Sequence, residues 1–595
     1  MNNPHPASHG GSFRSAPGAL CLLVSGIFSL AVAGCDDHSR PTHLAAARDV
    51  HVVAEPARHT QVASAAGKYL AGRFARRSRD FGSAARLLTD ALELDKENRR
   101  IRRQAFFALV ASGRFDEAAK LANLIVDGSN GAPISNLTLV VEDVRAQQFE
   151  QAAKRLVDMP KRGMNTFTSP LLVAWLYFAR GEVDKAVKAL DGLSKVASFA
   201  GLRNLHVGLI MDLAGNPVAA EEALKKSAKK TPSLRVVQAY GRFLERSGRP
   251  KEAKKLYQDF VAKADGANSL EAAFQRLKSG RKPERLVNNT NQGMAEVFFN
   301  LSGTLAQSRS TDLALIYGRF ALRLRPDFPL VQVLLGGLLE SLDRKNEALA
   351  LYDAVSPSSP LFWAARLRKA ETLDELKRTD EAIAQLKQMA GERADQYEPL
   401  TRLGDMLRAK KRYAEAASSY SQAVKRIGEL AKPHWSLLYA RGIAYERSKQ
   451  WPKAEADFLG ALKLSPEQPF VLNYLGYSWV DQGLHLDRAK GMIERAVQLR
   501  PNDGYIVDSL GWVLYRLRDY EGAARRLERA VILRPDDPTI NDHLGDAYWR
   551  VGRFLEARFQ WRRALSLDPD KKDIPTIVKK LQRGLADVPT RDRRG

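Results

Sequence analysis

Two stretches near the end of the chain, Asp508-Ser-Leu-Gly-Trp-Val-Leu-Tyr-Arg-Leu517 and Asp542-His-Leu-Gly-Asp-Ala-Tyr-Trp549, set similar residues at the same places. Their glycines, Gly511 and Gly545, are 34 residues apart. In each unit a second apolar segment follows at helical spacing, and a proline comes after it. Because a proline cannot continue a helix, it marks the end of the unit. The pattern indicates an internal repeat made of two helices.

The same frame runs backward through most of the chain. The small residue of the first helix falls at Gly476, Gly442, Gly404, Ala370, Gly336 and Ser302, and after a break at Gly241, Gly208, Ala174, Val140, Phe106 and Gly72. These spacings match the tetratricopeptide pattern of a helical hairpin. The sequence therefore predicts an all-α fold, a tetratricopeptide α-solenoid of about fourteen hairpins, in which the N-terminal repeats are degenerate.

Residue types in the repeat suggest how each hairpin packs. A glycine or alanine on the first helix lets the second helix approach closely, where we expect a small alanine to face it. Aromatic residues of the second helix, such as Tyr420, Phe458 and Trp561, are expected to fill the gap to the next hairpin. Each hairpin buries its apolar face only against its neighbours, so stability accumulates along the array.

The frame also predicts the domain organisation. Residues 63–265 form an N-terminal degenerate arm, 266–292 a helical insert and linker, and 293–570 a C-terminal arm. The insert contains a helical stretch from Ser269 to Leu277. Residues 571–595 are interpreted as a capping helix and a tail, because Ile574, Ile577 and Leu581 recur at helical spacing.

Residues 1–34 have the composition of an export signal. Arg14 is the single charged residue before Cys35, and the apolar run at 18–33 is short for a membrane span. The segment Val32-Ala33-Gly34-Cys35 resembles a bacterial lipobox, which implies cleavage between Gly34 and Cys35 and acyl chains on Cys35. An ordinary secretory signal with an incidental cysteine, or an uncleaved anchor, are the alternatives.

The lipobox interpretation places the protein in the bacterial cell envelope, facing the periplasm. Residues 35–62 then form a lipidated, flexible tether. Asp36 directly follows the lipidated position, and in enteric bacteria an aspartate there favours the inner membrane. The choice of membrane is left open by this residue alone.

Composition argues against several classes of function. The 595 residues carry 93 Lys and Arg against 68 Asp and Glu, a net charge of +25, but the excess is spread along the chain. Nucleic-acid binding is therefore not expected, since it concentrates basic residues in a patch. Two cysteines cannot build a disulfide scaffold or a four-cysteine zinc site. No catalytic or nucleotide-binding motif stands out, so we expect no enzyme, no cofactor, no metal and no small-molecule substrate.

The first helices of the last four hairpins offer a candidate protein-binding surface. Aromatic side chains alternate there with Asn and Asp, which suits capture of a peptide. The alternative for each residue is packing between adjacent hairpins. Acidic residues would repel a terminal carboxylate, so a basic or neutral segment is the expected ligand. The candidate residues are Tyr439, Phe470, Asn473, Tyr477, Tyr505, Asp508, Trp512, Tyr515, Asp542, Asp546 and Trp549.

Beyond the repeat itself, several segments resemble one particular family. Tyr474-Leu-Gly-Tyr-Ser-Trp-Val-Asp-Gln-Gly483, the two stretches quoted first, and Gly293-Met-Ala-Glu-Val-Phe-Phe-Asn300 are similar to a proteobacterial family of tetratricopeptide lipoproteins. The best-understood members of that family are lipoprotein adaptors of the periplasmic carboxyl-terminal processing protease CtpA. The resemblance implies an outer-membrane lipoprotein that binds such a serine protease and presents cell-wall hydrolases for degradation. The alternative is a lipoprotein scaffold for assembly of a secretion, pilus or polysaccharide-export machine.

Overall fold

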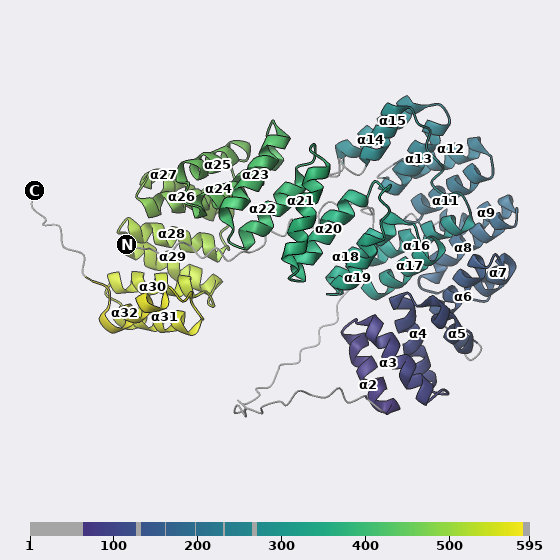
Figure 1. Cartoon of the computed structure of the whole chain (residues 1–595), viewed down its shortest axis with the longest axis horizontal. Coiled ribbons are helices and arrows are strands. Elements are labelled where there is room, and N and C mark those ends of the chain that lie inside the picture. Colours follow the sequence, from purple (N-terminus) through teal and green to yellow (C-terminus); the bar gives the residue numbers. More distant parts are fainter. Residues whose placement is uncertain are drawn as a thin grey trace, which may run out of the picture. The chain divides into compact units, whose positions relative to one another are not determined.

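The computed structural model describes residues 64–126, 133–160, 162–194, 196, 198–229, 232–263 and 270–586 (Figure 1). In these residues all regular secondary structure is helical, which confirms the predicted all-α fold. The predicted signal peptide, Gly34, Cys35, the tether and the end of the tail lie outside the described residues. None of the described helices is both long and apolar enough to cross a membrane.

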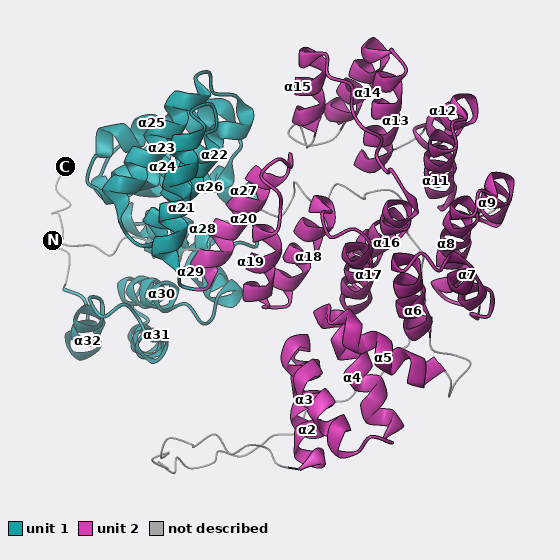
Figure 2. Ribbon diagram, turned by 45° about the vertical axis from the view of Figure 1, so that its right-hand side comes forward, with its two compact units in different colours: residues 1–14, 377–595 teal, residues 15–376 magenta. Residues whose placement is uncertain are grey.

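The chain forms two compact units that divide in sequence between Leu376 and Lys377 (Figure 2). This division lies inside the segment predicted as the C-terminal arm, whereas the predicted insert lies within the N-terminal unit. The helices of the N-terminal unit are α2 (Ala65–Arg77), α3 (Phe81–Leu94), α4 (Arg99–Ser112), α5 (Phe115–Val126), α6 (Pro133–Arg145), α7 (Phe149–Val157), α8 (Asn165–Ala179), α9 (Val183–Ala189), α10 (Asp191–Ser194), α11 (Ala200–Leu213), α12 (Pro217–Ser227), α13 (Leu234–Arg246), α14 (Pro250–Lys263), α15 (Glu271–Ser279), α16 (Thr290–Gln307), α17 (Thr311–Leu324), α18 (Pro329–Ser341), α19 (Lys345–Asp353) and α20 (Phe362–Glu375).

The C-terminal unit continues the same alternation of first and second helices. Its helices are α21 (Thr379–Glu392), α22 (Glu398–Ala409), α23 (Tyr413–Ile427), the short 3₁₀ helix η3 (Lys432–His434), α24 (Trp435–Arg447), α25 (Trp451–Leu464), α26 (Pro469–Gln482), α27 (Leu486–Leu499), α28 (Gly504–Arg516), α29 (Tyr520–Leu533), α30 (Pro538–Arg550), α31 (Phe554–Ser566) and α32 (Ile574–Arg583). Thirteen of the fourteen predicted hairpins have both helices in one unit. The ninth contributes α20 to the N-terminal unit and α21 to the C-terminal unit.

Within a hairpin the glycine of the first helix lies against a large side chain of the second. A Cβ atom added to Gly442 would lie 2.6 Å from Phe458, and one added to Gly545 would lie 2.5 Å from Trp561. These distances are shorter than a van der Waals contact, so only glycine allows this approach. The aromatic rings therefore fill the space above the glycine of their own hairpin. At Phe458 the ring also reaches the next hairpin, as predicted, because its centroid lies 5.2 Å from that of Tyr474 on α26.

Every turn between the two helices of a repeat contains a residue with left-handed backbone. In the turn after α22, Lys411 has φ 60°, and the next amide, that of Arg412, donates to the carbonyl of Leu407. This closure satisfies carbonyl groups at the end of the first helix. Six of the turns use glycine at this place and eight use another residue. The residues are Arg79, Gly113, Gln147, Gly181, Gly215, Gly248, Arg309, Asp343, Lys377, Lys411, Lys449, Gly483, Arg518 and Gly552.

The seventh hairpin, α16 with α17, packs back against earlier hairpins of the N-terminal unit. Helix α16 contacts α8, and α17 contacts α4 and α6. At Gly293 a Cβ atom would lie 2.4 Å from the indole of Trp175, and the rings of Phe115 and Phe320 are 5.9 Å apart. Arg323 pairs with Glu142 at 2.8 Å. One continuous apolar core therefore runs from Ala75 to Ala365 across the insert.

The C-terminal unit ends with a helix that covers the last hairpin. Helix α32 packs against α31 and buries Ile577, which is 2% exposed. This confirms the predicted capping helix. The cap belongs to an apolar cluster that extends from Leu438 to Ile577 and includes Trp479 and Trp561.

Candidate protein-binding surface

The eleven candidate residues lie on the first helices α24, α26, α28 and α30 of the C-terminal unit. Aspartates at the helix N-termini fix where two of these helices begin. Asp503 accepts hydrogen bonds from the amides of Tyr505 and Ile506, and Asp537 accepts them from Thr539 and Ile540. Such side chains satisfy amide groups that have no partner within the helix.

Burial divides the candidates into two groups. Tyr477, Asp508, Trp512, Asp542 and Asp546 are each at most 8% exposed. They pack between neighbouring hairpins, which was the alternative left open for each of them. Tyr439, Phe470, Asn473, Tyr515 and Trp549 are partly buried, and Tyr505 is 37% exposed.

The buried Asp508 pairs with a histidine of the next hairpin. Its Oδ1 atom lies 3.0 Å from Nδ1 of His543, which is 1% exposed. Burial alone would lower the pKa of His543, but the carboxylates of Asp508, Asp542 and Asp546 outweigh it and raise the pKa above its usual value. Trp512 stacks on the imidazole at 4.1 Å between ring centroids. The rings of Trp512 and Tyr515 also stack, with their centroids 4.9 Å apart.

Asp542 and Asp546 bind a lysine of the protein's own cap. The Nζ atom of Lys580 lies 3.0 and 2.8 Å from the two carboxylate oxygens of Asp542 and 2.8 Å from Oδ2 of Asp546. The indole of Trp561 donates to the other oxygen of Asp546 at 2.9 Å. Burial, followed by the charge of Asp546, raises the pKa of Asp542 to about 6, although Lys580 acts in the opposite direction. These two carboxylates are therefore engaged inside the molecule.

Trp549 lies under the end of the cap. Its ring is 4.6 Å from that of Phe554 and 5.4 Å from that of Trp561, measured between centroids. Gly584 has φ 72° and passes so close that an added Cβ atom would lie 1.9 Å from the indole. Arg550 next to it donates to the carbonyl of Ala586 at 2.9 Å. The cap thus covers the first helix of the last hairpin.

At the other end of the set, Tyr439 belongs to an aromatic cluster between hairpins. Its ring centroid is 6.1 Å from that of Phe458 and 5.8 Å from that of Tyr474. Tyr474 donates to Glu446 at 3.1 Å. Burial raises the pKa of Tyr439. Its role in the structure is to join two neighbouring repeats.

The remaining candidates, which are partly or fully exposed, lie on α26 and α28, and these two helices contact each other. We call Phe470, Asn473 and Tyr505 the aromatic face. The guanidinium of Arg500 lies 4.8 Å from the ring centroid of Phe470, and that of Arg534 lies 5.2 Å from Tyr505. Ring and guanidinium attract each other in this geometry. The carboxylates that favoured a basic ligand are paired internally, so the aromatic face presents rings and cations instead.

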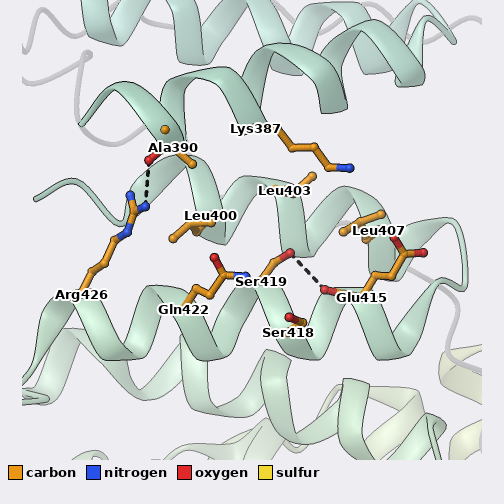
Figure 3. Close-up of a pocket in the computed structure, with 11 residues that line it drawn as sticks. Lys387, Ala390, Leu400, Leu403, Leu407, Glu415, Ser418, Ser419, Gln422 and Arg426 are labelled. Atoms are coloured by element: carbon orange, nitrogen blue, oxygen red, sulfur yellow. Dashed lines mark hydrogen bonds between the residues drawn. The ribbon is translucent and has the colours of Figure 1, made fainter. Parts of the chain in front are cut away.

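A separate pocket of about 370 Å³ opens between α21 and α23, with α22 as its floor (Figure 3). The floor is formed by Leu400, Leu403 and Leu407. At one end Arg426 donates to the carbonyls of Ala390, Arg393 and Gln396, which lie at and just beyond the C-terminal end of α21. None of the eleven candidates lines this pocket.

Two residues with central positions, His543 and Lys580, were not predicted from the sequence. The available signal was their spacing, because His543 follows Asp508 by 35 residues and Lys580 follows Asp546 by 34. Residues one repeat apart on first helices lie on adjacent hairpins. Within the described residues, no group of three or more His, Cys, Asp or Glu side chains is arranged to hold a metal ion.

Comparisons with known proteins agree with this architecture. Family models described as tetratricopeptide repeat match residues 75–137, 401–469 and 509–572. These stretches are tetratricopeptide repeats. They occur in both compact units, so the repeats extend across the division of the chain.

Two curated proteins are similar over parts of this chain. A TPR repeat-containing protein of Pseudomonas aeruginosa, PA4667, is 29% identical over 194 residues, which are 32% of this chain and 32% of that protein. The Superkiller complex protein 3 of Mus musculus is 32% identical over 99 residues, or 16% of this chain and 6% of that protein. The chain spans about a third or less of the length of either relative.

Solved repeat structures also align with the chain. The crystal structure of the APC/C hetero-tetramer Cut9-Hcn1 has a TM-score of 0.36 and 14% identity, covering 87% of this chain and 96% of that one. A tetratricopeptide repeat protein from Parabacteroides merdae has a TM-score of 0.35 and 14% identity, covering 42% of this chain and 97% of that one.

Proposed function

We propose that this protein is a lipid-anchored periplasmic scaffold that binds other proteins. Tetratricopeptide repeats generally bind protein partners, and the described residues consist of such helical hairpins. The observation that carries the proposal is the aromatic face, where Phe470 is partly exposed on α26 and Tyr505 is exposed on α28, two first helices that contact each other. Aromatic side chains flanked by arginines are typical anchors of protein interfaces.

The partner that we propose is a periplasmic carboxyl-terminal processing protease, to which the scaffold presents cell-wall hydrolases. Support for this step comes from the sequence: the lipobox-like segment ending at Cys35 and the resemblance of residues 474–483, 508–517 and 542–549 to lipoprotein adaptors. Acyl chains on Cys35 would hold the scaffold at the membrane, since each buried methylene contributes about 0.8 kcal/mol.

A crosslinked pull-down from the protein's own cells tests this proposal. The bait is the full-length protein, and the associated chains are identified by mass spectrometry. We expect a processing protease among them, and we expect cell-wall hydrolases to accumulate when the gene is deleted. Recovery of channel, pilus or export components without a protease would refute the adaptor role and support the assembly scaffold.

Two variants test the anchor and the binding surface separately. Replacing Cys35 by Ser should move the protein from the membrane fraction to the soluble fraction, and a protein that stays bound would contradict lipidation. Replacing Phe470 and Tyr505 together by Ala should reduce partner recovery at unchanged helicity. The matched control is Phe559→Ala, which removes a 62% exposed ring from the second helix α31. Equal recovery with all three proteins would exclude the aromatic face as the binding site.

A further inference from the structure

A cluster of arginines surrounds α13 in the N-terminal unit. Arg235 and Arg242 are seven residues apart, and this spacing places both on one side of the helix. Arg276 of α15 reaches the same region from the insert, because it pairs with Glu245 of α13. Arg325, just after α17, lies 3.7 Å from Glu296, the partner of Arg235.

Two buried carboxylates serve these arginines, and both are already engaged. Glu296 is fully buried and accepts two hydrogen bonds from Arg235, one of them at 2.8 Å from Nε. Glu245 is 6% exposed and accepts hydrogen bonds from Arg276 at 2.9 and 2.7 Å and from the hydroxyl of Tyr257 at 2.7 Å. Each carboxylate is thus held by two nitrogens, Nε and Nη2, of one guanidinium, the geometry in which arginine binds carboxylates most strongly.

Arg242 is left without such a partner. Among the described residues it forms no ion pair and donates no hydrogen bond, while the side chain remains partly exposed. Burial, followed by the positive charges of Arg235 and Arg276, lowers its pKa to about 10, although Tyr257 and Glu245 act in the opposite direction. In addition, Nε and Nη1 of Arg325 are buried and have no hydrogen-bond acceptor within the described part of the chain. Four arginines, Arg235, Arg242, Arg276 and Arg325, therefore face the buried Glu245 and Glu296 and the exposed Asp327, which lies 3.8 Å from Arg325.

An unpaired charge in partly buried surroundings is unfavourable unless something else binds to it. An oxyanion supplied from outside would pair with Arg242 and reduce its repulsion with Arg235 and Arg276. The neighbouring pairs show which oxyanion these elements accommodate, since Arg276 and Arg235 each hold a carboxylate through two nitrogens. Moreover, α13 is the first helix of its hairpin, and this class of helix carries the proposed partner-binding surface of the other unit.

We propose that Arg242, flanked by Arg235 and Arg276, is a binding site for a carboxylate side chain on an acidic segment of a protein partner. The site lies in the N-terminal unit and is independent of the aromatic face. The protein would then present two recognition chemistries, one for a carboxylate at α13 and one for apolar groups on α26 and α28.

The first test measures binding of an acidic probe to the purified full-length protein. The probe is a fluorescein-labelled peptide of twelve residues that alternates Glu and Ser, and fluorescence anisotropy reports binding. Loss of a charge-assisted pair should weaken the affinity of Arg242→Gln by about tenfold or more. The control is Arg86→Gln, which removes an exposed arginine of α3 and the same charge. Equal affinity of the two variants would overturn the proposal.

A second measurement separates a binding residue from a structural one. Without the probe, Arg242→Gln should unfold at the same temperature as the unmodified protein or higher, because it removes repulsion and breaks no ion pair. A lower unfolding temperature, with helicity changed, would show that Arg242 stabilises the fold and would overturn the proposal. Inorganic phosphate serves as a third probe. If phosphate stabilises the unmodified protein but the peptide does not bind, the assignment to a protein carboxylate is wrong.

Discussion

Replacing Lys580 by Met tests whether the cap is held by charge or by apolar packing. Methionine keeps most of the aliphatic length of lysine, so little apolar burial is lost. The ammonium group is removed from Asp542 and Asp546, whose side chains are 11% and 6% exposed. Removing one partner of a buried ion pair costs about 3 to 5 kcal/mol, because the other charge remains in surroundings of low polarity. Protonation of Asp542, whose pKa is already raised to about 6, would place the effect near the lower end at neutral pH.

Hydrogen exchange measured by mass spectrometry reports this loss locally. Amides of α30, α31 and α32 should exchange faster by about two orders of magnitude, since the expected loss is about 3 kcal/mol and 1.4 kcal/mol corresponds to a factor of ten. Lys579→Met is the control, because the neighbouring Lys579 is exposed. Combining Lys580→Met with Asp542→Asn and Asp546→Asn should restore part of the protection, since fewer buried charges are left unpaired. If Lys580→Met and Lys579→Met exchange alike, the buried pairs do not hold the cap.

Three further predictions concern the same unit. The folded-state pKa values of Asp542 and His543 are both raised, so folding favours their protonated forms. Their contribution to the free energy of unfolding should therefore fall as the pH rises from 5 to 8. Urea titration at several pH values should show a weaker pH dependence in His543→Gln. Lys411→Gly should increase the free energy of unfolding by about 1 kcal/mol, because Lys411 has left-handed backbone, whereas Lys410→Gly should not. Trp512→Ala should destabilise the unit by about 3 to 5 kcal/mol in urea unfolding, and a change below 1 kcal/mol would show that the ring is dispensable for packing.

The repeat frame was predictable from the sequence because it depends on local chemistry. Gly442 and Gly545 allow close approach of the second helix whatever the neighbouring hairpins do. A spacing of about 34 residues between such positions therefore located the helices of the repeats, and the helical spacing of Ile574, Ile577 and Leu581 located the cap. The turn residues with left-handed backbone recur in the same frame. Only six of the fourteen are glycine, so the positions of glycine in the sequence did not identify the other eight.

The candidate site was less predictable because burial depends on how closely adjacent first helices approach. Trp512 and Tyr505 are seven residues apart on α28, yet one is 7% and the other 37% exposed. The difference arises because His543 of the next hairpin stacks on Trp512, whereas Tyr505 lies at the start of the helix. Likewise, the return of α16 onto α8 is encoded by contacts between residues more than a hundred positions apart, such as Trp175 and Gly293.

Polar pairs distinguish the interfaces between neighbouring repeats, and between the last repeat and the cap, from one another. Most hairpins of the C-terminal unit use the same apolar contact, a glycine of the first helix against a large side chain of the second, so this contact does not distinguish one neighbour from another. The polar pairs differ at each interface: Asp481 with Arg516 at 3.3 Å, Asp508 with His543 at 3.0 Å, and Asp546 with Lys580 at 2.8 Å. A shift of one repeat would leave a buried carboxylate without its partner, which is costly. Each of these interfaces therefore carries a polar pair of its own in addition to the apolar contact that the tetratricopeptide pattern supplies.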